Sequence, residues 1–152
     1  KAVGMIRKAG MKAVVVSNQS GVARGFFDED FVRALHERIN VMLFEKGTVI
    51  DRFYFCPHHP TEGVGEYLYD CHCRKPKTGM LLRASEELDI DLSRSYMVGD
   101  TERDLETARN AGVTGVLVRT GYGKDIRDTE GAAYVAEDLL DAVNWILGDR
   151  EH

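Results

Sequence analysis

Short apolar runs that alternate with helical patterns constrain the fold of this chain more than any other feature. The runs lie at 12–16, 52–56, 96–98 and 115–118, and each is followed by polar residues, by glycine or by both. Strands that are separated by helices pair in parallel, because a parallel connection needs a long crossover. We therefore predict one α/β domain over residues 1–152, with a mostly parallel sheet and helices on both faces. Such a sheet places a binding site outside the carboxyl ends of its strands.

Helix ends can also be recognised in the sequence. Asp28 is suited to cap a helix that runs to Gly47, and Thr101 to Asp104 has the spacing of a capping box for a helix that Gly112 ends. Further helices are expected over 78–88 and after a last strand at 133–135. The helix after Asp28 has apolar residues on one face, which we expect to be buried: Phe31, Leu35, Ile39, Met42 and Leu43.

Composition excludes several kinds of partner. The formal net charge is −5, with 20 Lys and Arg against 25 Asp and Glu, and no basic stripe is present. We therefore expect neither nucleic acid nor an anionic lipid surface as partner. The apolar runs are too short to cross a bilayer, and the first ten residues are too polar for a secretory signal. We expect a cytoplasmic monomer that acts on a small molecule.

The three cysteines fall within residues 56–73, which is typical of a metal site in a reducing compartment and not of a disulfide framework. His59 and His72 are competing ligands, and the alternative is three reduced cysteines beside surface histidines. A closed site of this kind would be structural, would order the long loop at 56–73 and would hold Arg74 and Lys75 in place. The predicted donors to a tetrahedral Zn²⁺ are Cys56, His58, Cys71 and Cys73.

Polar residues at strand ends and helix starts suggest a phosphate site. Ser17 and Asn18 follow the first apolar run, where a hydroxyl and free N–H groups can bind a phosphoryl oxygen, although the same residues suit an ordinary turn. Asp100 ends "YMVGD" and could hold Mg²⁺ or cap the next helix. Lys75 suits a phosphoryl group, or else lies in solvent. Asp104 is better explained as a first-turn helix carboxylate than as a ligand.

The motifs resemble those of the haloacid-dehalogenase (HAD) phosphatases, most closely the zinc-containing D-glycero-D-manno-heptose 1,7-bisphosphate 7-phosphatases. The resemblance runs in the family's order through "VVVSNQSGVARGFF", "CPHHP", "CHCRKPKTGMLL", "SYMVGDTERD" and "VLVRTG". It implies a three-layer, Rossmann-like HAD fold with a minimal cap and a zinc-binding loop, acting in heptose precursor synthesis for lipopolysaccharide or S-layers. By resemblance, Ser17 and Asn18 belong to the second motif, Lys75 to the third and Asp100, with Mg²⁺, to the fourth. Ser17, Lys75 and Asp100 would be catalytic, Arg24 and Arg74 would contact the sugar phosphate, and Zn²⁺ would be held by Cys56, His58, Cys71 and Cys73.

The resemblance also implies an Asp-x-Asp nucleophile motif at the end of a first, central strand. The mechanism would pass through an aspartyl-phosphate, with charge neutralised by lysine and Mg²⁺. Asp28-Glu-Asp30 and Asp89-Ile-Asp91 have the spacing, but one lies at a helix start and the other follows a helix. We reject both as nucleophiles, and expect the central strand to lie before Lys1 and residues 1–152 alone to be inactive.

Alternatives to this interpretation differ in substrate or in class. Histidinol-phosphate phosphatases share the Cys-x-His and Cys-x-Cys-Arg-Lys-Pro arrangement, although "NQSGVARG" favours the heptose enzymes. A non-catalytic, zinc-stabilised phosphate-binding domain is the alternative outside enzymes. A nucleic-acid-binding zinc module is disfavoured by the acidic balance.

Overall fold

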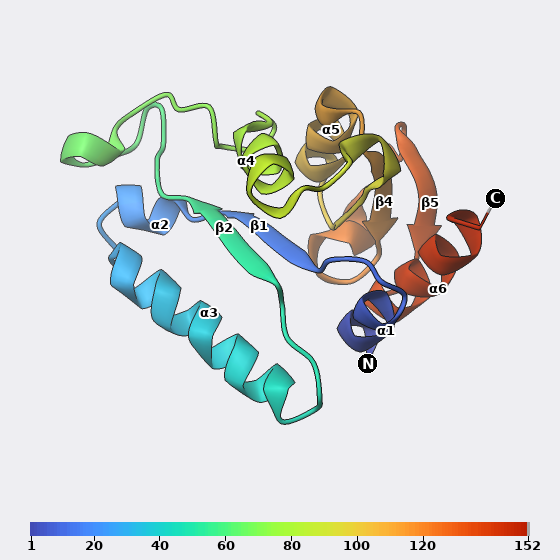
Figure 1. Cartoon of the computed structure of the whole chain (residues 1–152). Coiled ribbons are helices and arrows are strands. Elements are labelled where there is room, and N and C mark those ends of the chain that lie inside the picture. Colours follow the sequence, from blue (N-terminus) through green and yellow to red (C-terminus); the bar gives the residue numbers. More distant parts are fainter. Residues whose placement is uncertain (152) are drawn as a thin grey trace.

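Parallel strands joined by helices make up the computed structural model, which describes residues 1–151 (Figure 1). All strand pairs are parallel, which confirms the predicted α/β class. The elements are α1 (Ala2–Lys8), β1 (Val14–Asn18), α2 (Ser20–Ala23), α3 (Glu29–Phe44), β2 (Arg52–Cys56), the 3-10 helix η1 (Gly65–Tyr67), α4 (Gly79–Leu88), η2 (Leu92–Arg94), β3 (Tyr96–Gly99), α5 (Glu102–Ala111), β4 (Thr114–Val118), η3 (Gly121–Asp125), β5 (Ala132–Ala136) and α6 (Leu139–Asp149).

The strands form two hydrogen-bonded groups, β1–β2 and β3–β4–β5. Within residues 1–151 no ladder joins β1 to β3, although Val16 of β1 packs against the cluster of Met97, Ala108 and Val113. One edge of β1 is therefore unpaired in the described chain, and none of the β1 residues is fully buried. An apolar strand of this kind is suited to full burial, and in the described chain β1 is only half-buried.

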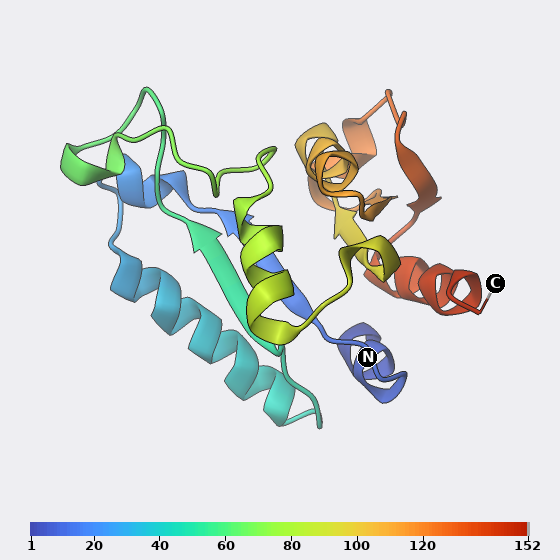
Figure 2. The ribbon, with the colours of Figure 1, turned by 45° about the horizontal axis from the view of Figure 1, so that its top comes forward.

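Two helices cover opposite faces of the β1–β2 pair (Figure 2). The His36 ring of α3 stacks on Phe53 of β2 with the ring centroids 4.3 Å apart. Tyr54, the next residue of β2, packs with Met80 and Ala84 of α4. Because successive side chains of a strand point to opposite faces, this alternation fixes α3 on one side and α4 on the other.

The buried face of α3 differs from the one that its periodicity predicts. Val32 and His36 are the buried residues, so the helix is rotated by about one residue from the expected face. Packing of His36 on the β2 rings decides this orientation, and a periodic pattern cannot contain that information. Of the five expected core residues, Leu43 is half-buried and the other four are exposed, with exposed fractions of 57% for Phe31, 46% for Leu35, 36% for Ile39 and 53% for Met42.

The second half of the chain has α5 and α6 packed on the β3–β5 sheet, with α1 beside α6 (Figure 1). The Thr101 hydroxyl caps α5 by accepting from the Asp104 N–H, and Gly112 ends the helix at a φ of 71°, so both predicted helix signals are confirmed. The core of this half contains Val116, Val118, Ala136, Ala142 and Ile146. Among residues 1–151, every helix is too short or too polar to cross a membrane.

Burial of His36 predicts a pH-dependent stability. Desolvation lowers the pKa of His36, so the folded protein keeps the ring neutral at a pH where the unfolded chain binds a proton. This contribution to the free energy of unfolding is present above about pH 6.5, the ordinary pKa of histidine. It is lost as the pH falls toward the lower pKa that His36 has in the folded protein. We expect the free energy of unfolding of the wild type to drop more than that of His36→Gln between about pH 7.5 and 5.5. Chemical denaturation measures it, with exposed His72→Gln as control; equal drops in the wild type and His36→Gln would contradict the prediction.

Candidate active site and metal centre

The predicted site residues lie at the carboxyl ends of the strands. Ser17 and Asn18 are the last residues of β1, Cys56 is the last residue of β2, and Asp100 directly follows β3. The loop at 71–78 lies between β2 and α4 in the sequence and brings Lys75 to the same edge. Parallel pairing is the physical reason, because it sends the carboxyl ends of neighbouring strands to one edge.

Asn18 holds the backbone of Lys75. Its side-chain oxygen accepts from the Lys75 N–H at 2.9 Å, and its amide donates to the Lys75 carbonyl oxygen at 3.2 Å. Both polar atoms of the Asn18 side chain are thus engaged by a residue 57 positions away. The structure places Asn18 as the group that positions Lys75.

Lys75 and Asp104 form a largely buried ion pair. The Lys75 Nζ donates to Asp104 Oδ1 at 2.8 Å and to the Val16 carbonyl oxygen at 3.4 Å, and the two side chains are 15% and 8% exposed. Asp104 Oδ2 accepts from the Asp100 N–H at 3.2 Å and from the Thr101 hydroxyl at 2.9 Å. Asp104 does lie in the first turn of α5, as expected, but it also joins Lys75 to the backbone of Asp100.

Sequence reasoning missed this second task of Asp104. A signal was present, because Asp100 and Asp104 are four positions apart at the end of a strand and the start of a helix. A carboxylate in the first helical turn can reach back to a backbone N–H at the start of the helix. The partner lysine lies 29 positions away and could not be assigned from a local pattern.

The Asp100 carboxylate has one oxygen held by the protein. Its Oδ2 accepts from the Tyr122 N–H at 3.2 Å. Its Oδ1 receives no hydrogen bond from residues 1–151, and the side chain is half-buried. A hard cation such as Mg²⁺ binds through one or two carboxylates and completes its shell with water and substrate phosphate, so this donor fits Mg²⁺.

The other side chains that were predicted to bind substrate differ in whether they are free to bind a ligand. The Ser17 hydroxyl accepts from Gln19 Nε2 at 3.3 Å and can still donate to an anion. Arg74 Nη1 is buried without a hydrogen-bond partner among the described residues, which is costly unless a ligand supplies an acceptor. Arg24 is already paired with Glu62 of the loop at 56–73, at 2.5 Å.

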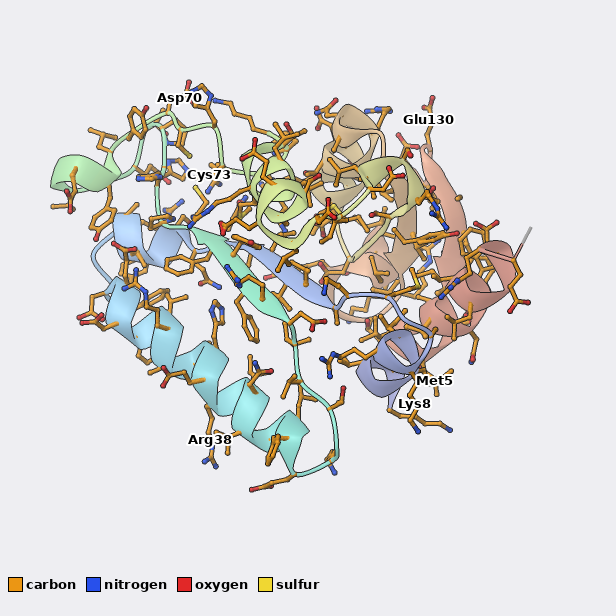
Figure 3. All side chains as sticks on the ribbon, viewed as in Figure 1. Met5, Lys8, Arg38, Asp70, Cys73 and Glu130 are labelled. Atoms are coloured by element: carbon orange, nitrogen blue, oxygen red, sulfur yellow. The ribbon has the colours of Figure 1, made fainter. Side chains whose placement is uncertain are left out.

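The four predicted zinc ligands lie together, with their donor atoms within 4.8 Å of one another. The Cys56 sulfur is 3.1 Å from that of Cys71 and 2.8 Å from that of Cys73, and His58 Nδ1 is 3.6 Å from the Cys73 sulfur. Cys73 comes from the loop that returns to the end of β2 (Figure 3). Three sulfurs and one imidazole nitrogen around a common centre fit tetrahedral zinc.

The structure also separates His58 from its two competitors. His59 Nδ1 accepts from the N–H groups of Thr61 and Glu62 at 3.1 and 2.9 Å, which closes a turn of the loop. His72 is exposed. Neither ring belongs to the group of converging donors.

Hydrogen bonds among the three cysteines favour loss of a proton from one of them, which favours binding of a cation. The hydrogen bond from Cys73 lowers the pKa of Cys56 to about 5, and the same contact raises the pKa of Cys73. Thiolates, not thiols, bind zinc, so zinc binding would release the protons that remain on this cluster.

Close packing at Gly99 yields a prediction. A methyl group at Gly99 would overlap the side chain of Asp104, which holds Lys75. We expect Gly99→Ala to lower the melting temperature, and to lower about 10-fold or more the phosphatase turnover that the resemblance implies, because it pushes a buried ion pair apart. Gly148→Ala is the control, since nothing lies within 4 Å of a methyl group there. Steady-state assay and thermal melting measure both effects; wild-type turnover in Gly99→Ala would show that the Asp104 position does not matter.

Comparison with known proteins places the chain in a family. Residues 72–142 match the family model described as HAD-hydrolase-like. The chain is 44% identical over 149 residues to the D-glycero-beta-D-manno-heptose-1,7-bisphosphate 7-phosphatase of Pasteurella multocida, covering 97% of this chain and 80% of that protein. It is 48% identical over 137 residues to the phosphatase of the same name from Haemophilus influenzae, covering 90% and 74%.

A solved structure agrees with these relatives. The crystal structure of D,D-heptose 1,7-bisphosphate phosphatase from B. bronchiseptica, complexed with magnesium and phosphate, superposes with a TM-score of 0.83 at 36% identity. The match covers 97% of this chain and 80% of that protein. Shared sequence and shared fold extend across nearly the whole chain, and it therefore belongs to the HAD-like family of heptose-1,7-bisphosphate 7-phosphatases.

Proposed function

We propose that the protein is a Mg²⁺-dependent phosphomonoesterase that removes the C7 phosphate of D-glycero-D-manno-heptose 1,7-bisphosphate. The observation that carries the proposal is the cluster of Lys75, Asp104 and Asp100 at the strand ends, in a chain that belongs to the family named for this substrate. The proposal includes a monomer and a cytoplasmic location. Reduced cysteines favour a reducing compartment of this kind.

Each side chain has a task in this reaction. Asn18 holds the Lys75 backbone and Asp104 holds the Lys75 ammonium group, which attracts the phosphoryl group and stabilises the charge on its oxygens. The Ser17 hydroxyl and Arg74 Nη1 are suited to bind the remaining phosphate oxygens. Asp100 Oδ1 would hold Mg²⁺, which supplies charge neutralisation on the phosphoryl oxygens when bound. Arg24 would bind the sugar-phosphate end of the substrate.

The described carboxylates do not supply the nucleophile of the family mechanism. Asp28 caps α3 and Asp91 caps η2, and each accepts the N–H of its own helix start. Asp89 lies at the end of α4, and Asp30 pairs with Arg33. Asp104 is the only carboxylate of residues 1–151 that bonds to Lys75, and it is committed to that ion pair. This observation favours a second candidate function for residues 1–152, a phosphate-binding domain without turnover.

The proposed zinc-binding loop, residues 56–73, would support the substrate site through its contacts with α2 and α3. Its backbone is joined to α2 by the Val64 N–H, which donates to the Ala23 carbonyl oxygen at 2.8 Å, and its Tyr67 hydroxyl donates to Glu29 of α3 at 2.7 Å. Zinc closed by four protein ligands leaves no open position for water, so its role here would be structural. Through these contacts the loop fixes the two helices that follow β1.

Phosphate release is the experiment that tests the function. Residues 1–152 and the protein with any further residues that its coding sequence specifies are assayed in parallel, with and without Mg²⁺. The substrates are the α and β anomers of the heptose 1,7-bisphosphate and histidinol phosphate. We expect Mg²⁺-dependent turnover of the bisphosphate by the protein that includes any such residues, with histidinol phosphate at least about 100-fold poorer in kcat/KM. Preference for histidinol phosphate would overturn the substrate, and binding of phosphate without turnover in either form would support the second candidate.

A further inference from the structure

The turn after β4 packs directly on the Asp100 carboxylate. It consists of η3 and the residues on either side of it, 119–126, and its Tyr122 N–H donates to Asp100 Oδ2. Asp100 is also fixed through its own N–H, which donates to Asp104. The orientation of this carboxylate therefore depends on the position of a turn that lies 22 residues further along the chain.

Arg119 closes this turn. Its Nη1 donates to the carbonyl oxygens of Gly123 and Ile126, at 2.9 and 2.5 Å, so that one guanidinium group holds both the middle and the end of the turn. The Arg119 N–H donates to the Ala136 carbonyl oxygen of β5 at 2.8 Å, which anchors the residue to the sheet. A charged donor to two carbonyl oxygens is a strong restraint, because such hydrogen bonds are roughly twice as strong as neutral ones.

The turn has no space to move toward Asp100. Gly121 has a φ of 59°, and a methyl group there would lie 2.5 Å from Asp100 Oδ2. Gly123 is buried, and a methyl group there would overlap the Val118 carbonyl oxygen. Only glycine at both positions permits the approach that brings the Tyr122 N–H to Asp100.

We propose that Arg119 is a positioning residue for the cation site: by clamping the turn, it holds the Tyr122 N–H against Asp100 Oδ2, so that Oδ1 would be available to bind Mg²⁺. The inference rests on the proposed function in one respect, that Asp100 binds Mg²⁺. Outer partners that orient a metal-binding carboxylate typically change metal affinity 10- to 100-fold when they are removed.

The sign of the effect distinguishes positioning from charge. Removal of a cation near a Mg²⁺ site strengthens Mg²⁺ binding if the charge alone matters, because like charges repel. Loss of positioning weakens Mg²⁺ binding. The control is Lys124→Ala, which removes an exposed cation from the same turn and leaves the Arg119 hydrogen bonds in place.

Calorimetric titration of the full-length protein with Mg²⁺ tests the proposal. We expect Arg119→Ala and Gly121→Ala to raise the Mg²⁺ dissociation constant about 10-fold or more, with zinc content unchanged and with most of kcat restored at saturating Mg²⁺. Lys124→Ala should leave the constant unchanged or slightly lower. Gly121→Ala keeps the Arg119 charge and crowds Asp100 directly, so it tests the contact even if Arg119→Ala melts the turn.

Two results would overturn the inference in different ways. If Asp100→Asn weakens Mg²⁺ binding but Arg119→Ala and Gly121→Ala stay within about twofold of the wild type, the clamp has no role and the proposed function stands. If Asp100→Asn itself leaves Mg²⁺ binding unchanged, Asp100 is not the ligand and both the cation-site assignment and the clamp fail.

Discussion

Asp100→Asn is expected to reduce turnover by at least about 100-fold while the protein stays folded. The substitution removes the negative charge that would bind Mg²⁺, and charge stabilisation of a phosphoryl group typically contributes an effect of this size. The volume of the side chain hardly changes, an amide oxygen can still accept from the Tyr122 N–H, and the Asp100 N–H keeps its bond to Asp104. Phosphate release from the bisphosphate measures turnover, and a thermal melt without Mg²⁺ measures the fold.

Asp125→Asn is the matched control for this substitution. Asp125 lies in η3, in the same turn that packs on Asp100, is exposed, and makes no side-chain hydrogen bond within the described part of the chain. Its substitution changes the local charge by the same amount and should leave turnover within about twofold. Unchanged activity in Asp100→Asn would remove Asp100 from the site.

Cys73→Ser is expected to lower the zinc content from about one ion per chain to a small fraction, and the melting temperature by about 10 °C. Loss of a metal is among the few causes of large destabilisation, and in a domain of this size about 3 kcal/mol corresponds to such a shift. The Cys73 sulfur lies 2.8 Å from that of Cys56 and 3.0 Å from that of Cys71, so a hydroxyl there removes one of three converging thiolates. Metal analysis and differential scanning calorimetry are the measurements.

The neighbouring histidine provides the control for the zinc assignment. His72→Asn alters an exposed residue beside Cys73 and should change neither zinc content nor melting temperature. A chelator should lower the melting temperature of the wild type to that of Cys73→Ser and have little further effect on the variant, since zinc binding contributes folding free energy. Full zinc content in Cys73→Ser, or its loss in His72→Asn, would refute the ligand set.

The sequence alone determined the features whose signals are local. Parallel strands followed from β-branched runs separated by helices, and both ends of α5 followed from Thr101 and Gly112. The three cysteines and a nearby histidine could be predicted as zinc donors because the donor types lie in one short segment, whereas the structure was needed to prefer His58 over His59 and His72. Each of these signals depends on residues within a few positions of one another, so their effect on the backbone does not require knowledge of the rest of the fold.

Only the tertiary structure decided which groups meet across long stretches of chain. In the structure Val32 and His36 of α3 are buried in place of the expected face. The Asn18 side chain hydrogen-bonds to the Lys75 backbone, and the Lys75 ammonium group pairs with Asp104. The fold also brings the turn held by Arg119 onto Asp100. The hydrogen bonds that the side chains of Asn18, Lys75 and Asp100 make in the site join residues that are 22 to 59 positions apart. The geometry of these hydrogen bonds is set by the packing of whole helices on the sheet. A local sequence pattern specifies which chemical groups are present, but not how far apart the fold places them.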